Sequence, residues 1–302
     1  MTTTADPTSP STGVVLDIAP LSGTIGAEIR GLRLADGLDD ATVAAVRQAL
    51  LDYKVVFFPG QHLTPAEHKA FASRFGTLTN AHPVIPGIGD HKEVFEIDYT
   101  QSRKFLEAEA SRSGNDYGDR DKWHTDVTFV ENPPLGSVLN AVVIPEAGGD
   151  TLWADTQAAY EGLSEPFRQL VDGLTAVHDG NHAFGKLLEA LGEGEWEGRK
   201  FTRLESVEHP VVRTHPETGR RNLFVNPGFT IRIKGVSRRE SDTLLAFLYA
   251  HMAQPEYVVR YRWEAGDIGF WDNRTTMHYA ITDYGQAHRV IQRVTLQGDR
   301  PY

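Results

Sequence analysis

The chain carries Trp123-His124-Thr125-Asp126 and, far downstream, Trp271-Asp272-Asn273-Arg274-Thr275-Thr276-Met277-His278, the two stretches that decide its fold and chemistry. One residue separates His124 from Asp126, which places both side chains on one face if the segment is an extended strand. The second stretch closes a β-like run with a turn, so His278 is expected on the next strand. Two imidazoles and a carboxylate can form a three-ligand facial site with open positions, the geometry that non-haem Fe(II) oxygenases prefer.

Composition limits the possible classes of protein. The 302 residues, 40% hydrophobic and 24% charged, are enough for one large domain or two small ones. A formal net charge of −11 argues against general affinity for nucleic acid or anionic membranes. Because the chain has no cysteine, disulfides, thiolate metal sites and cysteine nucleophiles are excluded, and any metal must be held by His, Asp or Glu.

The chain shows no targeting or membrane signal. No apolar run approaches the roughly 20 residues of a membrane helix, and the N-terminus lacks the basic and apolar regions of a signal peptide. We therefore expect a cytoplasmic enzyme. Residues 1–12 are rich in Thr, Ser and Pro and predict a disordered tail, which leaves 13–302 as a single domain.

Hydrophobic patterns predict a mainly β protein with flanking helices. Helices are expected at 40–52 after Asp39, near 156–173, and after two capping-box sequences that begin at Thr64 and Ser237, the second with Leu244, Leu245 and Leu248 facing inward. Short aromatic and β-branched runs predict strands at 55–58, 127–130, 137–144, 211–214, 223–226, 257–262, 267–271, 276–281 and 289–297. These strands do not alternate with helices, which favours a closed or two-sheet antiparallel core with the helices outside.

Two long segments, 86–121 and 180–207, show no regular pattern. The first is rich in Pro and Gly and leads into His124, and the second is charged and rich in Gly. Irregular segments of this length in a compact domain are usually lids or disordered. Both are therefore predicted to be lid-like insertions, and the first is the better candidate because it adjoins His124.

A lone His-x-Asp pattern is weak evidence, because most of the twelve histidines are expected to make ordinary hydrogen bonds. Arg289 strengthens the case, since it should lie on the strand after His278 as a hairpin partner would. Arg293, four residues on, points to the same strand face. Two inward arginines are costly unless anions pair with them.

Further stretches extend these features into a family resemblance. They are Trp123 to Phe129, Gly148-Gly149-Asp150-Thr151-Leu152-Trp153, His209-Pro210-Val211-Val212-Arg213-Thr214-His215-Pro216, Phe224-Val225-Asn226-Pro227-Gly228-Phe229-Thr230 and Trp271-Asp272-Asn273-Arg274. From about residue 15 to the C-terminus, the chain resembles the taurine dioxygenase family of Fe(II)/2-oxoglutarate-dependent oxygenases. The resemblance implies a double-stranded β-helix, or jelly roll.

The resemblance also implies a role for each matching position. His124, Asp126 and His278 would ligate Fe(II), and Thr151 and Arg289 would bind the distal carboxylate of 2-oxoglutarate, for which a guanidinium fork is suited. His82 and Arg293 occupy the positions that hold the anionic head group of the substrate. The carboxylate at position 126 makes halogenation unexpected, because related halogenases lack it.

The expected substrate pocket departs from the taurine enzyme at two positions. Ile85 stands where that enzyme has tyrosine, and Arg120 where it has asparagine. Ile85 favours an apolar substrate body, and Arg120 could meet a second anionic group, so taurine itself is not the expected substrate. Phe129, Phe184 and Phe229 are further candidates for the pocket lining, although aromatic residues are more often plain core.

The implied reaction consumes 2-oxoglutarate and O2, yields succinate and CO2, and hydroxylates a small anionic substrate. Hydroxylation beside a heteroatom in an alkyl sulfonate or sulfate ester would release sulfite or sulfate with an aldehyde. Three alternatives stay open: the same chemistry on a carboxylate, phosphonate or secondary metabolite, a zinc hydrolase with the same ligands, and a non-catalytic jelly-roll binding protein. A homo-oligomer, dimer or tetramer, is expected from the family.

Overall fold

The computed structural model describes residues 14–98 and 123–302. The predicted tail 1–12, most of the predicted insertion 86–121 and Arg120 therefore lie outside the described residues. In the two described ranges, no helix has both the length and the apolar character needed to cross a bilayer.

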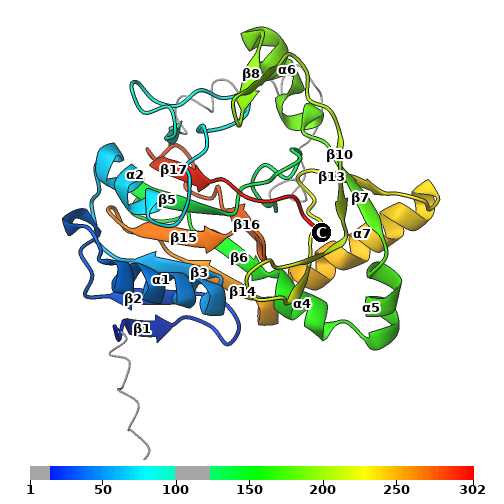
Figure 1. The fold of residues 1–302 in the computed structure, drawn as a ribbon, viewed down its shortest axis with the longest axis horizontal. Coiled ribbons are helices and arrows are strands. Elements are labelled where there is room, and N and C mark those ends of the chain that lie inside the picture. Colours follow the sequence, from blue (N-terminus) through cyan, green and yellow to red (C-terminus); the bar gives the residue numbers. More distant parts are fainter. Residues whose placement is uncertain (1–13, 99–122) are drawn as a thin grey trace, which may run out of the picture.

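A seven-stranded sheet forms one side of the molecule (Figure 1). Its order is β1 (Asp17–Pro20), β2 (Ala27–Arg30), β3 (Val55–Phe58), β15 (Ile268–Asp272), β5 (Gly136–Val143), β17 (Val290–Leu296) and β4 (Phe95–Asp98). All neighbours are antiparallel except β2 and β3.

Smaller antiparallel sheets complete the β structure. Two have three strands: β14 (Val258–Tyr261), β6 (Thr151–Asp155) and β16 (Thr276–Ala280), and then β10 (Val207–Pro210), β7 (Thr175–His178) and β13 (Thr230–Ile233). Two have two strands: β11 (Val212–Thr214) with β12 (Arg221–Leu223), and β8 (Gly194–Trp196) with β9 (Arg199–Phe201). This arrangement confirms the prediction of a mainly β protein with flanking helices.

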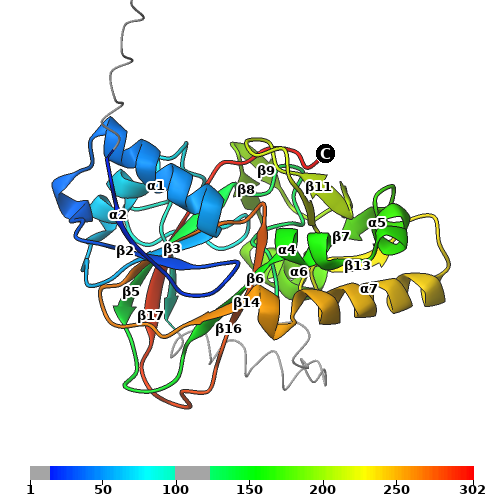
Figure 2. The same ribbon diagram turned by 90° about the horizontal axis from the view of Figure 1, so that it is seen from below.

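The helices of the described residues pack around the β structure (Figures 1 and 2). They are α1 (Asp40–Tyr53), α2 (Pro65–Ser73), α4 (Thr156–Gly162), α5 (Glu165–Val171), α6 (Asn181–Leu191) and α7 (Arg238–Met252), with short 3-10 turns at Leu34–Asp36 and Pro255–Tyr257. The expected caps are present: Asp39 accepts from the Thr42 amide, and capping boxes open α2 at Thr64 and α7 at Ser237. Within α7, Leu245 and Leu248 are buried as predicted, whereas Leu244 is half-buried.

Three apolar clusters join these layers. The first packs α1 and α2 against the large sheet through residues such as Leu50, Phe71 and Phe270. The second packs α4, α5 and α7 against the smaller sheets. The third lies between the large sheet and β14-β6-β16, where Phe57 stacks on Tyr261 with ring centres 3.7 Å apart and Trp153 packs against Trp271. The two sheets are thus held face to face, and the candidate metal ligands described below lie where the two sheets meet.

Several predictions about local structure are wrong. Residues 127–130 form a turn rather than a strand, because Val127 has a left-handed φ of 54°. The predicted strand 223–226 is only partly present, because β12 ends at Leu223 and a turn follows.

The two predicted insertions also contain regular structure. The segment 180–207 contains α6 and the β8–β9 hairpin, which lie at the top of Figure 1. It packs its apolar residues Leu188 and Trp196 in a fourth core cluster. The described part of the first insertion includes β4, which pairs with β17 at the edge of the large sheet. The irregular chain expected for these segments is thus replaced by regular structure at 95–98 and in much of 180–207, and their role as lids stays a prediction.

Candidate metal centre and anion pocket

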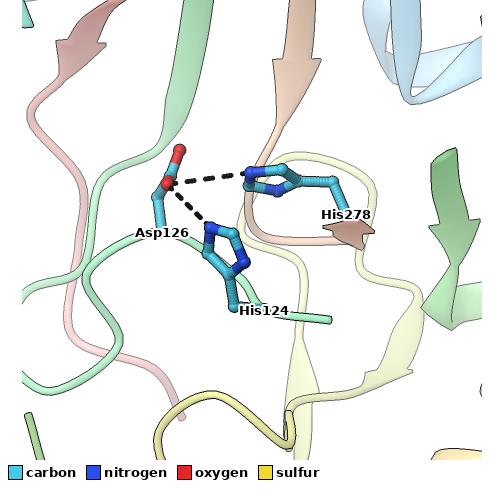
Figure 3. A group of neighbouring side chains, drawn as sticks. All are labelled: His124, Asp126 and His278. Atoms are coloured by element: carbon cyan, nitrogen blue, oxygen red, sulfur yellow. Dashed lines mark ion pairs between the residues drawn. The ribbon is translucent and has the colours of Figure 1, made fainter. Parts of the chain in front are cut away.

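His124, Asp126 and His278 converge at the meeting of the two sheets (Figure 3). Their candidate ligand atoms all lie within 4.8 Å of one another. Asp126 Oδ1 is 3.7 Å from His124 Nε2 and 3.9 Å from His278 Nε2. Because both separations exceed hydrogen-bond length, the three donor atoms surround a common point without pairing directly. An ion bound at that point would contact all three atoms.

Backbone pairing fixes the two histidines. His278 lies on β16, and His124 forms an isolated antiparallel bridge with it. The His124 amide donates to the His278 carbonyl at 2.9 Å, and the His278 amide donates to the His124 carbonyl at 2.7 Å. The prediction that His278 follows a turn onto a strand is confirmed. The expectation that His124 and Asp126 share one strand is wrong, because the chain turns directly after Thr125.

Asp126 is oriented by side chains from two strands of the large sheet. Its Oδ2 accepts from Ser137 Oγ at 2.6 Å, and its Oδ1 accepts from Arg293 Nη1. Ser137 Oγ in turn accepts from Asn273 Nδ2 at 2.9 Å. Trp271 Nε1 donates to Asn273 Oδ1 at 2.8 Å. This chain of bonds fixes the carboxylate from behind, as outer-shell partners do at metal sites.

The electrostatic environment keeps His278 and Asp126 in the protonation states that a metal needs. Burial lowers the pKa of His278 to about 3, and the neighbouring His124 adds to this effect, so the imidazole is neutral. Burial acts to raise the pKa of Asp126, but Arg293 and the two histidines outweigh it and hold the pKa below its usual range. Neutral imidazoles and a carboxylate are the forms that bind divalent cations.

A second feature of the site is Arg289, a buried guanidinium whose surroundings suit an anion. It lies just before β17, donates to the Gly149 carbonyl at 3.2 Å, and has its Cζ 5.6 Å from the centre of the Tyr284 ring. No carboxylate among the described residues forms an ion pair with it, and its Nε has no hydrogen-bond partner there. Burial lowers the pKa of Arg289, yet an arginine side chain stays charged in proteins. A buried cation in these surroundings is costly until an anion pairs with it.

The Gly148–Thr151 segment packs against the Arg289 side chain at Gly149. Gly149 has a φ of 77°, and a Cβ there would come within 3.0 Å of Arg289 Nε, so only glycine leaves room for the guanidinium. Thr151 Oγ1 is buried and accepts from Trp263 Nε1 at 2.9 Å. Since the indole only donates, the hydroxyl proton of Thr151 is available for an acceptor in the pocket.

His82 is a further buried side chain that interacts electrostatically with Arg293. One of its ring nitrogens already has hydrogen-bond partners. Its Nδ1 accepts from the amides of Val84 at 3.1 Å and Ile85 at 3.2 Å. The ring proton is therefore on Nε2, which is a donor. Burial, with a contribution from Arg293, lowers the pKa of His82 to about 3, so the ring is neutral.

The three phenylalanines singled out in the sequence form one cluster beside His82 and His124. The ring centre of His82 lies 4.4 Å from that of Phe184 and 6.1 Å from that of Phe129. Phe129 is 4.8 Å from Phe229, which presents its edge to His124 at 6.1 Å. Phe184 comes from α6, and Ile85 and His82 line a cavity of about 500 Å³ next to that helix.

Two expectations about β17 have different outcomes. Arg289 and Arg293 are both buried, as expected for two inward side chains four residues apart. The prediction of a hairpin between their strand and that of His278 is wrong, because β16 pairs with β6 while β17 pairs with β5 and β4. Ser137, Asn273 and Trp263 were not predicted. Asn273 lies within a quoted stretch, but only the fold brings it to Ser137.

Comparisons with known proteins agree with this geometry. The family described as "Taurine catabolism dioxygenase TauD, TfdA family" matches residues 17–295. An alpha-ketoglutarate-dependent sulfate ester dioxygenase from Pseudomonas putida is 43% identical over 95% of this chain and 91% of its own length. An alkylsulfatase from Acinetobacter baylyi is 41% identical over 94% of this chain and 86% of its own length. Alpha-ketoglutarate is another name for 2-oxoglutarate.

The fold also has solved counterparts. A taurine dioxygenase from Burkholderia xenovorans, known from its crystal structure, superposes with a TM-score of 0.79 and 42% identity. The superposition covers 95% of this chain and 92% of that one. The similarity therefore extends over nearly the whole chain.

Proposed function

Because the chain belongs to the taurine catabolism dioxygenase TauD, TfdA family, we propose that it hydroxylates a small alkyl sulfate ester or sulfonate. The chain is a 2-oxoglutarate-dependent dioxygenase. The observation that carries the proposal is the convergence of His124, Asp126 and His278, whose candidate ligand atoms lie within 4.8 Å of one another, in a chain 43% identical to a sulfate ester dioxygenase.

In this proposal His124, Asp126 and His278 hold Fe(II). The donor set fits, because two imidazole nitrogens and one carboxylate oxygen form the facial triad of non-haem Fe(II) oxygenases, with positions left open. Bound iron, with 2-oxoglutarate and O2, would supply the oxidising chemistry that yields succinate, CO2 and a hydroxylated substrate. The protein contributes the fixed orientation of Asp126 through Ser137 and the neutral state of His278.

Arg289 and Thr151 would hold the distal carboxylate of 2-oxoglutarate. The guanidinium supplies charge and a donor fork, and the Thr151 hydroxyl supplies a neutral donor. Arg289 Nε, which lacks a protein partner among the described residues, is accounted for by this carboxylate. Gly149 leaves the guanidinium the space that this role requires.

His82 and Arg293 would hold the anionic head group of the substrate. Nε2 of His82 is a donor because Nδ1 accepts two backbone amides. Arg293 Nη1 is paired with Asp126, and its Nε, which is unpartnered among the described residues, would be left for the head group. The rings of Phe129, Phe184 and Phe229, with Ile85, would pack against the apolar part of the substrate and exclude water from it. Arg120, at the family's substrate position, is a further candidate.

A sulfate ester fits this arrangement chemically. With the head group at His82 and Arg293, the carbon bonded to the ester oxygen would face the metal. Hydroxylation of that carbon gives a hemiacetal-like ester, whose C–O bond to sulfate breaks to leave an aldehyde and sulfate. A sulfonate hydroxylated at its α-carbon breaks the C–S bond instead, which leaves an aldehyde and sulfite.

Other substrates remain as the second candidate. A carboxylate, phosphonate or secondary metabolite could use the same anion-binding pair, and Ile85 with the phenylalanine cluster favours an apolar body on any of them. A zinc hydrolase would give Arg289 and Thr151 no role. The jelly-roll description of the two facing sheets, the cytoplasmic location and the homo-oligomeric state stay predictions.

A substrate panel tests the proposal. Alkyl sulfates of increasing chain length, alkyl sulfonates including taurine, phosphonates and aryloxy acids are each incubated with enzyme, Fe(II), 2-oxoglutarate and air. We expect an alkyl sulfate to give sulfate and succinate in a ratio near one, and Arg293→Ala to form succinate with much less sulfate. Equal turnover of aryloxy acids or phosphonates with no sulfate or sulfite from any sulfur compound would contradict the substrate class.

A further inference from the structure

The turn at 226–230, between β12 and β13, closes on itself with buried hydrogen bonds. The Asn226 amide donates to Thr230 Oγ1 at 2.9 Å, and the Thr230 amide donates to the Asn226 carbonyl at 3.0 Å. Asn226 Oδ1 also accepts from the Phe229 amide at 2.9 Å. This turn belongs to the stretch Phe224 to Thr230. None of its residues is assigned to metal ligation or cosubstrate binding, and only Phe229 is a candidate for the substrate lining. Its rigidity therefore calls for another role.

The turn presses directly against His124 at Gly228. The Gly228 amide donates to the Trp123 carbonyl at 3.1 Å. A Cβ at this position would lie only 2.8 Å from His124 Cβ, closer than real side chains approach. His124 cannot simply retreat, because its backbone is paired on the other side with His278. Because Gly228 has no side chain, His124 can occupy its observed position, and a larger residue at 228 would displace it.

The same turn is bonded to the segment that carries Asp126. Asn226 Nδ2 donates to Thr128 Oγ1 at 3.0 Å, and Thr128 is fully buried two residues after Asp126. His178 Nδ1 lies 3.0 Å from the same hydroxyl. His209 Nε2 lies 3.0 Å from the Thr128 carbonyl and 3.1 Å from the Val130 carbonyl, so this nitrogen carries the proton and donates to both.

These hydrogen bonds hold a strained backbone conformation in place. Val127, between Asp126 and Thr128, is β-branched and has a φ of 54°, a conformation that such residues rarely adopt. Strain of this kind persists only where surrounding contacts over-determine it. Buried hydrogen-bond networks restrain a region, and of the side chains in this one only His209 has a buried atom, Nδ1, without a partner among the described residues. The bonds from Asn226, His178 and His209 provide that constraint for the turn at 126–130.

We propose that the turn at 226–230 is a positioning element for the metal centre. Through Gly228 it sets the place of His124, and through the Asn226–Thr128 bond it sets the place of Asp126. Both contacts come from the β10-β7-β13 side of the molecule, whereas the strand that carries His278 holds His124 from its other side. The inference rests on the proposed function, since it assumes that these residues bind a divalent metal.

The primary test is Gly228→Ala, with Gly173→Ala as the matched control. Gly173 is exposed and has no positive φ, and a Cβ added there would meet no heavy atom within 4 Å. Metal affinity of the full chain is measured anaerobically with Fe(II), and with Mn(II) as a probe that needs no turnover. We expect Gly228→Ala to weaken binding by roughly 10- to 100-fold, as loss of outer-shell support does, and Gly173→Ala to match wild type.

A second pair of variants covers the case in which Gly228→Ala does not fold. Thr128→Val removes the hydroxyl at nearly constant shape, and Thr128→Ser keeps it. We expect Thr128→Val to weaken Mn(II) binding and Thr128→Ser to restore most of it, with both variants folded by circular dichroism. A role confined to stability would lower the unfolding midpoint of Thr128→Val and leave the Mn(II) affinity of the folded protein unchanged.

The outcomes separate the two proposals. Wild-type affinity for Mn(II) and Fe(II) in both Gly228→Ala and Thr128→Val overturns the positioning role alone. A wild-type protein that binds neither metal overturns the proposed function, and the positioning role with it. Weakened binding in Gly228→Ala and Thr128→Val, with normal binding in Gly173→Ala, supports both.

Discussion

Two buried clusters in this protein are built from the same kinds of residue. In the closed cluster the charged groups are paired with one another, whereas in the open cluster the histidine nitrogens and the carboxylate are too far apart to form hydrogen bonds. The closed cluster joins Asp272, Arg274 and His215. Arg274 donates to Asp272 through Nε at 2.8 Å and Nη2 at 2.6 Å, and His215 Nε2 lies 3.1 Å from Asp272 Oδ2. His215 Nδ1 accepts from the amides of Glu217 and Thr218. Each charged group here has its counter-charge.

The open cluster contains His124, Asp126 and His278, with Arg293 and Arg289 nearby. Its imidazole nitrogens stand 3.7 and 3.9 Å from the carboxylate oxygen, beyond hydrogen-bond range. His278 Nδ1, Arg289 Nε and Arg293 Nε lack partners among the described residues. From the spacing of the three ligand atoms and the family of the chain, we infer that ligands bind at the open cluster. The complete cluster indicates a support for the fold.

The sharpest way to break this comparison is to remove one member of the open cluster. We expect His278→Ala to lose more activity than the roughly 10- to 100-fold that loss of an outer-shell partner costs, because a metal ligand is removed. Succinate formation is the measurement, and the unfolding midpoint without metal should be near that of wild type. Coupled turnover close to wild type would contradict the ligand assignment. Asp126→Ala should behave in the same way.

Removing one member of the closed cluster should instead lower stability. Asp272→Asn removes one of two counter-charges of Arg274, because Glu217 Oε1 still accepts from Arg274 Nη1 at 2.7 Å. The expected loss is therefore at or below the about 3–5 kcal/mol of a buried pair broken completely. Urea denaturation at neutral pH measures this change in the free energy of unfolding. The folded variant should still bind Mn(II) with wild-type affinity. A variant as stable as wild type but unable to bind metal would reverse the roles that we give the two clusters.

The stabilising effect of Asp272 should depend on pH in one direction. Burial acts to raise its pKa, but Arg274 and His215 outweigh this and hold the pKa below the usual value. A lowered pKa in the folded state means that the stabilisation is complete above the unfolded value, about 3.9. It is lost as the pH falls further through the folded value. The difference between wild type and Asp272→Asn should therefore shrink below about pH 4, and a constant difference would contradict this origin.

A smaller loss of activity is expected when Arg289 is replaced. This variant tests whether Arg289 belongs to the open cluster. Arg289→Ala should raise the KM for 2-oxoglutarate by roughly 10- to 150-fold, since hydrogen bonds to charged groups contribute about 1.5–3 kcal/mol. Mn(II) affinity should be unchanged. Arg238→Ala is a suitable control because Arg238 is exposed on α7. An unchanged KM for 2-oxoglutarate in Arg289→Ala would remove Arg289 from the cosubstrate site.

Much of the fold follows from local patterns in the sequence. The capping boxes at Thr64 and Ser237 and the buried strand at 55–58 were predictable because the signals lie within a few residues. The turn at 126–129 was not, because its β-branched and aromatic residues are typical of strands. Bonds from Asn226 and His209, distant in sequence, hold it in a turn.

The convergence of His124, Asp126 and His278 was predictable from the two quoted stretches, and the structure brings these residues together. The way in which the backbone brings them together was not predictable, because a single bridge between His124 and β16 replaces the strand that we expected to carry His124 and Asp126. Nor does the sequence separate the open cluster from the closed one. Asp272 and His278 belong to the same stretch, and only the hydrogen-bond partners of each distinguish support from site.

The most direct test of the central claim is an anaerobic titration of wild-type enzyme with Fe(II) and then 2-oxoglutarate, followed by visible absorption. A chelated Fe(II)–2-oxoacid complex gives a charge-transfer band. We predict a band that saturates at one equivalent of each per chain, that is absent in His278→Ala and that persists in folded Asp272→Asn. No band in wild type, or an equal band in His278→Ala, would contradict the claim that the open cluster is the iron and cosubstrate site.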